Sequence, residues 1–439
     1  MSNRRQNRLL AVERHGVDAV PKAERTKGWA DLFVIYTGLN IAMVTLLVGG
    51  LLVPALSWAE VVFVMLVGNT IVGLFMALMG YMGVDHGIPA AVMSRIFLGY
   101  PVGTGLCSVA LLVSLTGWFA VNAEIGGMAV DKVTSELFGF SSPRIMILIL
   151  GVANVIVSII GIESIKWLSR LSVPLLLVIM VWLAATILSE YPLVDLVTYE
   201  ATGEISVTTA IDWTIGGLIV GIFIASDISR HVRSRRDNWI GIMAGVVPSS
   251  AFLMGLGALT SLATGDWNPV NGIEALGLGA PALFVIIFST WTTNDLNLYS
   301  GGLALTNIVP ALSRWQNTLI LGAAGTILAM MRITEHFTTF LELLLNIFAP
   351  LIGVALTDYF AIRRGQLDLD VVHEGGSRAL YSRGVNLVAW TVVIIGTVVA
   401  VLTPEHLVAS IVSMCVSAGL YWVLMRMIHP AYFIGKGSA

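Results

Sequence analysis

Charged residues are scarce in this sequence: Asp, Glu, Lys and Arg make up 12% of its 439 residues. A soluble domain carries about 25% charged residues, so this composition excludes a water-soluble surface. Apolar residues make up 56% of the chain and form unbroken runs. These runs are about twice as long as the alternating ten-residue strands of a membrane β-barrel. The predicted class is an all-α polytopic membrane protein.

Cysteine and histidine are also rare. Cys107 and Cys415 both lie in apolar runs, and the seven histidines lie in tails, connections or span ends. This excludes a disulfide framework, haem ligation and zinc chemistry. The chain also lacks nucleophile-elbow, metalloprotease, P-loop and dinucleotide-binding signatures. We therefore expect no enzyme, no organic cofactor, no nucleic-acid partner and no obligate protein partner, leaving the lipid bilayer and a small molecule as partners.

Twelve apolar segments are each long enough to cross a hydrocarbon core about 30 Å thick. Residues 1–30 precede them as a polar tail without the apolar core of a signal peptide. The predicted spans are 31–54, 58–82, 101–130, 144–162, 170–189, 211–229, 239–264, 280–305, 315–331, 337–357, 385–402 and 406–427.

The distribution of Lys and Arg predicts the orientation. With the N-terminus in the cytoplasm, 21 of the 24 basic residues fall in cytoplasmic segments. Only Lys132, Arg144 and Arg332 remain for the outer side. Such an asymmetry is what the positive-inside rule requires. We expect a multi-pass protein of the inner (plasma) membrane with both termini in the cytoplasm.

Two spans are poor continuous helices. The first contains Gly-Leu-Asn at 38–40, and the sixth contains the glycine- and polar-rich stretch 221–229. Paired interruptions in corresponding helices indicate a transporter built from inverted repeats, whereas the glycine pairs 49–50 and 216–217 favour close helix packing. The predicted organisation is a cytoplasmic tail (1–30), a first repeat (31–189), a second repeat (211–357), two extra helices (385–427) and a cytoplasmic tail (428–439).

Four carboxylates lie inside predicted spans: Glu124, Asp227, Asp295 and Glu342. Ionisable residues within a membrane are functional candidates by default. Glu342 could equally face an interface, Asp227 could pair with Arg230, and Glu124 could bond to a neighbouring helix. Asp295 is the hardest to explain structurally, since it belongs to the polar stretch TWTTNDLNLYSGG at 290–302.

The same polar stretch predicts a binding site. The hydroxyls of Thr292 and Thr293, with carbonyls freed by a broken neighbouring helix, would form an oxygen-only site suited to Na⁺. Asn294 offers a donor and an acceptor, which fits the amide-like edge of a heterocycle. Trp118 and Phe223 could sandwich a flat ring, although isolated aromatics more often face lipid or core.

The chain resembles nucleobase–cation symporter family 1, most closely its bacterial cytosine permease branch, over nearly its whole length. The resemblance rests on KGWADLFVIYTGL (27–39), GN (68–69), TGWF (116–119), VGIFI (220–224), WTTND (291–295) and LYSGGLALTNI (298–308). WTTND is the most specific of these motifs.

The resemblance implies the leucine-transporter fold, with five-plus-five inverted repeats, two added helices and cation-coupled alternating access. It implies that Trp118 and Phe223 sandwich the base while Asn294 binds its edge. It also implies a Na⁺ site formed by the carbonyls of Gly38, Ile41 and Ser289 and the hydroxyls of Thr292 and Thr293.

The substrate pocket departs from the cytosine permease pattern. Ile222 and Ala225 replace serines near Phe223, Ser226 could restore one hydroxyl, and Glu124 stands where cytosine members are apolar. Ser226, Glu124 and Asp227 are therefore added to the candidate substrate residues. The predicted function is Na⁺ symport of cytosine or a related planar nitrogen heterocycle. Alternatives are a purine, hydantoin, allantoin or hydroxymethylpyrimidine cargo, proton coupling, or a channel or receptor on the same scaffold.

Overall fold

The structure is a computed structural model that describes residues 19–100, 102–160, 162–309, 311–367, 381 and 384–428. Within these ranges every regular element is a helix, and the only β contacts are two isolated bridges. In chain order the elements are η1 (Lys22–Glu24), α2 (Trp29–Asn40), α3 (Met43–Leu51), α4 (Trp58–His86), α5 (Ala90–Leu98), α6 (Val102–Phe138), α7 (Pro143–Ile160), α8 (Ile162–Glu190), α9 (Leu193–Val197), α10 (Val207–Phe223), α11 (Ala225–Ser229), α12 (Arg235–Thr264), α13 (Pro269–Ala275), α14 (Gly279–Ile308), α15 (Arg314–Met330), η2 (Ile333–His336), α16 (Phe337–Leu356), the π-helical η3 (Thr357–Ile362), α18 (Leu387–Leu402) and α19 (Ala409–Ile428).

The first predicted span is broken, as expected, into α2 and α3, which meet at an angle of 63°. The break lies at Ile41 and Ala42, whose backbones leave the helical region. Gly38 itself remains helical in α2, so the expectation that the chain unwinds at Gly38 was wrong by about one turn of helix. A glycine lowers helix stability by only about 1 kcal/mol, which packing within a protein readily offsets.

The sixth predicted span is interrupted at one residue, Ile224, between α10 and α11. Gly221 lies inside α10. The predicted packing role of Gly49 is supported, because an added Cβ would lie 1.9 Å from the carbonyl oxygen of Met254 on α12. At Gly216 an added Cβ would lie 3.2 Å from Leu341 on α16. Gly49, Gly50 and Gly216 therefore serve close helix approach, whereas Gly217 has only an ordinary contact, with Val48 at 3.6 Å.

Among the described residues, five helices are long and apolar enough to cross a bilayer, or six if α2 and α3 count as one span. Four shorter apolar helices, at 143–159, 174–190, 207–223 and 387–402, coincide with further predicted spans. The count of twelve and the inverted-repeat arrangement stay predictions. The predicted connections also contain short helices, α5, α9 and α13, which hydropathy does not reveal.

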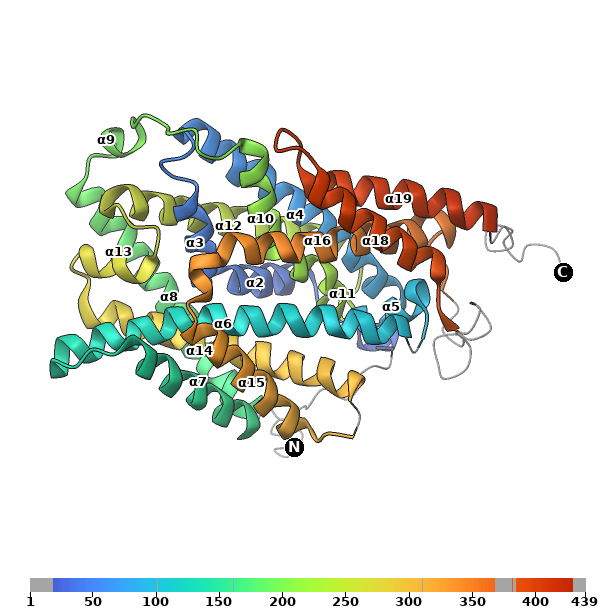
Figure 1. The fold of residues 1–439 in the computed structure, drawn as a ribbon, viewed down its shortest axis with the longest axis horizontal. Coiled ribbons are helices and arrows are strands. Elements are labelled where there is room, and N and C mark those ends of the chain that lie inside the picture. The colour runs from blue at the N-terminus through green and yellow to red at the C-terminus, as the bar shows by residue number, and fades with distance from the viewer. Residues whose placement is uncertain are drawn as a thin grey trace.

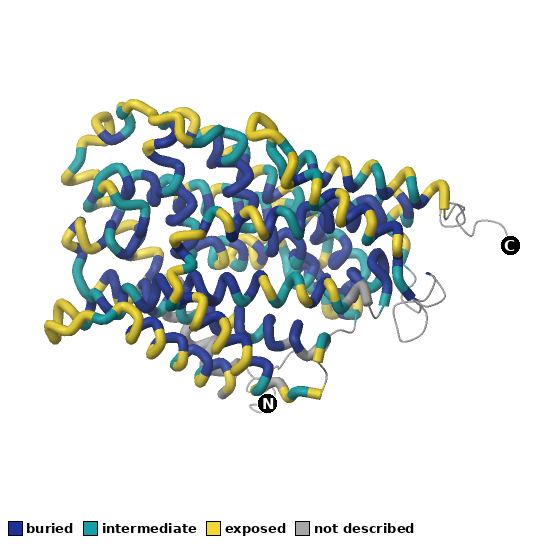
Figure 2. The backbone as a smooth tube through the Cα atoms, in the orientation of Figure 1, coloured by how far each residue is buried: buried dark blue, intermediate teal, exposed yellow. Residues whose placement is uncertain are grey.

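The outer faces of the bundle are apolar. Large side chains such as Phe63, Ile149, Val181 and Val401 are exposed, and buried residues run through the interior (Figure 2). A hydrocarbon surround accommodates such a surface, which water would not. Cys107 is buried as expected, whereas Cys415 is exposed on α19, so only Cys107 is an interior packing residue.

The bundle has two distinct ends, with α5 at the right of the view and α9 and α13 at the left (Figure 1). At the first end, Arg25 donates to the Asp85 carbonyl (3.1 Å) and Arg235 pairs with the Asp85 carboxylate. At the second end, Lys132 pairs with Glu274 on α13 at 2.5 Å. We call these the inner and the outer end, following the orientation that the charge distribution predicts.

Candidate functional site

The polar helix α14 brings three of the predicted cation ligands together. The hydroxyls of Thr292 and Thr293 both donate to the carbonyl of Ser289, at 2.9 and 3.1 Å. Hydroxyls bonded to their own helix keep lone pairs that can still accept or coordinate. The Ser289 carbonyl and the two hydroxyls therefore form one cluster of oxygen atoms on one side of α14.

The break in the first span frees the two other predicted ligands. Ala42 N–H, the usual helical partner of the Gly38 carbonyl, instead donates to Asn40 at 2.7 Å. Thr45 N–H, the usual partner of the Ile41 carbonyl, donates to Ala42 at 3.0 Å. Ile41 is buried and Gly38 is half-buried. A carbonyl without its helical partner needs another one where water is excluded, so both oxygens are suited to bind a cation. Within the described chain no hydrogen bond joins them to the α14 cluster.

Trp118 lies on α6 against the start of α16. Its ring meets Phe337 and Phe340 edge to face, with centroids 6.2 and 5.1 Å away. Phe223, at the end of α10, meets Phe348 of the same helix at 5.4 Å. Both predicted ring-binding aromatics thus rest on α16. No ring contact between described residues joins Trp118 to Phe223, so their pairing around a substrate stays a prediction.

Asn294 is fully buried, and its amide nitrogen donates to the Phe119 carbonyl on α6 at 3.1 Å. Asn297 donates weakly to its amide oxygen at 3.4 Å. The side chain is therefore oriented by α6 and one helical turn of α14. Its role at the edge of a substrate stays a prediction, because one of its donors is already used between helices.

The two candidates on α11 lie next to the break at Ile224. Ser226 is buried, and its hydroxyl has no hydrogen-bond partner within the described chain. Asp227 accepts from the N–H of Ala90 at 2.7 Å and so caps the N-terminus of α5. A carboxylate at this position is favoured by the helix dipole. Asp227 thus has a structural role as the cap of α5, and its substrate role stays a prediction.

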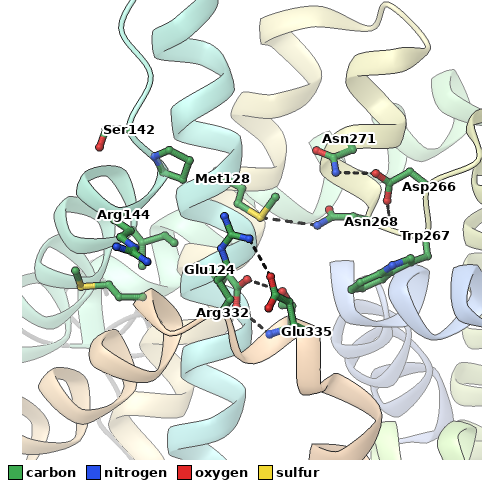
Figure 3. Close-up of a pocket in the computed structure, with 14 residues that line it drawn as sticks. Glu124, Met128, Ser142, Arg144, Asp266, Trp267, Asn268, Asn271, Arg332 and Glu335 are labelled. Atoms are coloured by element: carbon green, nitrogen blue, oxygen red, sulfur yellow. Dashed lines mark hydrogen bonds and ion pairs between the residues drawn. The ribbon is translucent and has the colours of Figure 1, made fainter.

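Glu124 lies elsewhere, at a cavity of about 510 Å³ at the outer end (Figure 3). It is 3% exposed and accepts hydrogen bonds from the Thr334 hydroxyl and from Thr334 N–H, the latter at 2.9 Å. Trp267 and the Arg332–Glu335 ion pair (2.9 Å) also line the cavity. The hydrogen bond to Glu335 raises the pKa of Arg332. Glu124 therefore faces the outer cavity and the hairpin before α16.

Asp295 is fully buried on α14, and neither carboxylate oxygen has a hydrogen-bond partner among the described residues. A buried polar group without a partner costs about 1–3 kcal/mol, and more if charged. Asp295 therefore has no hydrogen-bonding role among the described residues, and its predicted role in function or gating stays a prediction. Glu342 lies on α16 and is exposed.

The aromatic residues of α16 were not identified from the sequence. Phe337, Phe340 and Phe348 were read only as parts of an apolar span, yet they contact both candidate aromatics. Their spacing of three and eight residues places them on one helical face. That spacing could have suggested a common surface but not its partner.

Residues 19–435 match the profile of the permeases for cytosine/purines, uracil, thiamine and allantoin. The chain belongs to this family. It is the family that the sequence motifs resemble, nucleobase–cation symporter family 1. The protein is accordingly an integral membrane transporter of nucleobase-like substrates and not an enzyme.

Individual relatives in nucleobase–cation symporter family 1 carry different cargoes. The chain is 26% identical to a hydantoin permease of Microbacterium maritypicum, over 87% of this chain and 83% of that protein. It is 27% identical to a cytosine permease of Escherichia coli (strain K12), over 79% of this chain and 80% of that protein. The fold is similar to the inward-facing conformation of Mhp1, with a TM-score of 0.87, 23% identity and 96% of each chain covered.

Proposed function

We propose that this protein is a Na⁺-coupled importer of cytosine or a closely related planar nitrogen heterocycle, working by alternating access. The proposal rests on two groups of oxygen atoms: the two carbonyls at the break of the first span and the cluster on α14. One broken helix frees two carbonyls, and one intact helix gathers a carbonyl and two hydroxyls. Five neutral oxygens suit a hard monovalent cation.

The proposed cation site joins two separate elements of the fold. Gly38 and Ile41 belong to the first span, whereas Ser289, Thr292 and Thr293 belong to α14. A bound ion would hold the two elements together and lose ligands when they separate. Binding would thus favour one arrangement of the helices by its differential affinity for the two.

The proposed substrate site lies between Trp118, Phe223 and Asn294, with Ser226 as a further hydroxyl. Two aromatic faces favour a flat ring by offset stacking, and an amide binds a heterocycle edge. Hydantoin is a second candidate cargo. The match to the hydantoin permease supports it, because that match spans 87% of this chain against 79% for the cytosine permease. Proton coupling in place of Na⁺ is the alternative mode of transport.

The proposed membrane arrangement follows the sequence. It has twelve spans with both termini in the cytoplasm of an inner (plasma) membrane protein. Residues 31–189 and 211–357 form the two inverted repeats, followed by two extra helices at 385–427. The separate interruptions at Ile41–Ala42 and at Ile224, in the first and sixth spans, support the repeat.

Uptake into proteoliposomes tests the coupling. Radiolabelled cytosine and hydantoin are supplied with an inward Na⁺ gradient, or with choline in its place. We expect concentrative uptake only with Na⁺, and we expect Thr293→Val to raise the Na⁺ concentration needed. Thr290→Val is the matched control, because the Thr290 hydroxyl bonds only to Ile286 and Ile287 of its own helix. Uptake that ignores both Na⁺ and Thr293→Val would refute the coupling.

A ligand panel on purified protein separates the cargoes. A ligand at 100 times its Kd adds about 2.7 kcal/mol to stability, so thermal shifts rank cytosine, hydantoin, allantoin and purines directly. A channel or receptor on this scaffold would show a shift without uptake against a gradient.

A further inference from the structure

The outer halves of α6 and α16 form a continuous seam. Thr334, Phe337 and Phe340 are each three residues apart, which places them on one side of η2 and the first turn of α16. They meet Glu124 and Trp118 on α6 in antiparallel order. Six residues separate the contacts on each helix, about 9 Å along α6.

The seam is tightly packed at its inner part. A Cβ added to Gly117, the residue before Trp118, would lie 2.2 Å from the Phe340 ring. The Phe340 ring therefore presses directly on the α6 backbone and covers Trp118. Phe337 contacts the same tryptophan and lies three residues from Thr334, which lines the outer cavity. The two phenylalanine rings thus lie on Trp118 in the part of the chain that leads to this cavity.

Among the described residues, the hydrogen bonds of the seam lie at its outer part. Glu124 accepts from both the N–H and the hydroxyl of Thr334. Its carboxylate is the last group of the seam before the cavity (Figure 3). The neighbouring Arg332–Glu335 ion pair lies within the hairpin itself, three residues apart. Among the described residues, the hydrogen bonds between this hairpin and α6 are therefore those that Glu124 accepts.

We propose that Glu124 is a positioning residue that holds the outer part of α16 closed over Trp118. Release of its two bonds lets η2 and Phe337 move away from α6 and opens Trp118 to the outer cavity. The inference rests on the proposed function insofar as Trp118 forms a wall of the substrate site. It assigns Glu124 to control of access, in place of direct substrate contact.

The two hydrogen bonds between Glu124 and Thr334 set how strongly the seam is expected to open in the variants. A hydrogen bond to a charged group shifts an equilibrium by about 10- to 150-fold. We expect Glu124→Ala to raise the ratio of open to closed seam by at least about tenfold. Glu124→Gln keeps one acceptor oxygen for Thr334 N–H and should give an intermediate shift. Thr334→Val removes only the hydroxyl and should also be intermediate.

The first experiment measures the seam directly in the full-length protein. Spin labels on Leu137 of α6 and Met331 of the hairpin, both exposed side chains, report their separation by pulsed electron resonance. We expect one short distance in the parent and an added longer population in Glu124→Ala. Glu335→Gln is the matched control, since it removes a carboxylate of the same hairpin and should leave the distance unchanged.

The second experiment uses transport as a readout. If the seam controls access from outside, Glu124→Ala lowers the external KM through a larger binding-competent population and lowers the maximal rate. A purely structural defect would lower the rate without lowering KM. Glu124→Gln should restore part of both values.

The results separate the two proposals. The role of Glu124 is overturned if the distance between the two labels stays unchanged in both Glu124→Ala and Thr334→Val. It is also overturned if Glu335→Gln changes this distance as much as Glu124→Ala does. Thr334→Val keeps the test open if Glu124→Ala fails to fold. If no heterocycle is taken up, the proposed function fails, and the distance measurement still decides how the seam is held.

Discussion

The contact between α3 and α12 allows a prediction with a definite sign. An added Cβ at Gly49 would lie 1.9 Å from the Met254 carbonyl oxygen and 2.6 Å from two further backbone atoms. The reverse contact exists as well, because a Cβ at Gly257 would lie 2.1 Å from the Leu46 carbonyl oxygen. Backbone atoms cannot rotate aside, so Gly49→Ala must move α3 away from α12.

The required movement is large for a packed interior. Ordinary van der Waals contact begins at 3.4 Å, so the two helices must separate by roughly 1.5 Å at this point. Overpacking of this kind costs about 1–3 kcal/mol, and occasionally more. Alanine returns up to about 1 kcal/mol through its better helix propensity. Subtracting the full return from the overpacking cost leaves a net loss of up to about 2 kcal/mol.

Gly217→Ala is the matched control for Gly49→Ala. Its nearest neighbour would be a Val48 methyl group at 3.6 Å, an ordinary contact, so the same substitution should be neutral or stabilise by up to about 1 kcal/mol. Unfolding midpoints in detergent compare the two variants. Because α3 begins just after Ile41, Gly49→Ala should also raise the Na⁺ concentration for half-maximal uptake. Equal midpoints and equal Na⁺ dependence for the two variants would refute the reasoning.

Three further predictions concern buried charge and the ion. Asp295→Asn should preserve or raise the unfolding midpoint, since it removes a buried carboxylate without a partner among the described residues; a clear drop would reveal a partner. Asp358→Asn should lower the free energy of unfolding by about 3–5 kcal/mol, because Asp358 forms a buried ion pair with Arg363 at 2.6 Å. Asp237→Asn breaks an ion pair with the exposed Arg233. Apart from the loss of its capping bonds, it should cost under about 1 kcal/mol. Replacing Na⁺ by choline should weaken heterocycle binding in calorimetry, and unchanged affinity would count against a shared site.

Much of the fold could be predicted from hydropathy, because the bilayer fixes how long an apolar helix must be. The predicted start of α4 at residue 58 and the end of α12 at residue 264 coincide with the structure. The short helices in the connections could not be predicted this way. α5 depends on a cap from Asp227, which lies 137 residues away in the chain. Such long-range partners leave no local pattern.

Only part of the candidate site could be predicted, again because some of its residues bond to partners far away in the sequence. The adjacent hydroxyls of Thr292 and Thr293 could be identified from the sequence, whereas Ser289 was implied only by the family resemblance; the structure joins all three within one helical turn. The partner of Glu124 could not, since Thr334 lies 210 residues away. The interhelical bond of Asn294 to Phe119 was equally hidden. Polar residues within a membrane indicate where partners are needed, but only the tertiary structure identifies them.

The polar stretch of α14 raises the question of why this helix stays intact while the apolar first span breaks. Thr290, Thr292 and Thr293 all bond back to carbonyls of their own helix, so their polarity is satisfied without unwinding. At the break of the first span, the Thr37 hydroxyl has no hydrogen-bond partner among the described residues, and the Thr45 hydroxyl donates across the break to the Asn40 carbonyl. One helix thus offers hydroxyls from a rigid element, and the other offers carbonyls from an interrupted one. In the proposed site, a cation that needs both would bind only when the two elements approach, which links ion binding to helix position without any ionisable ligand.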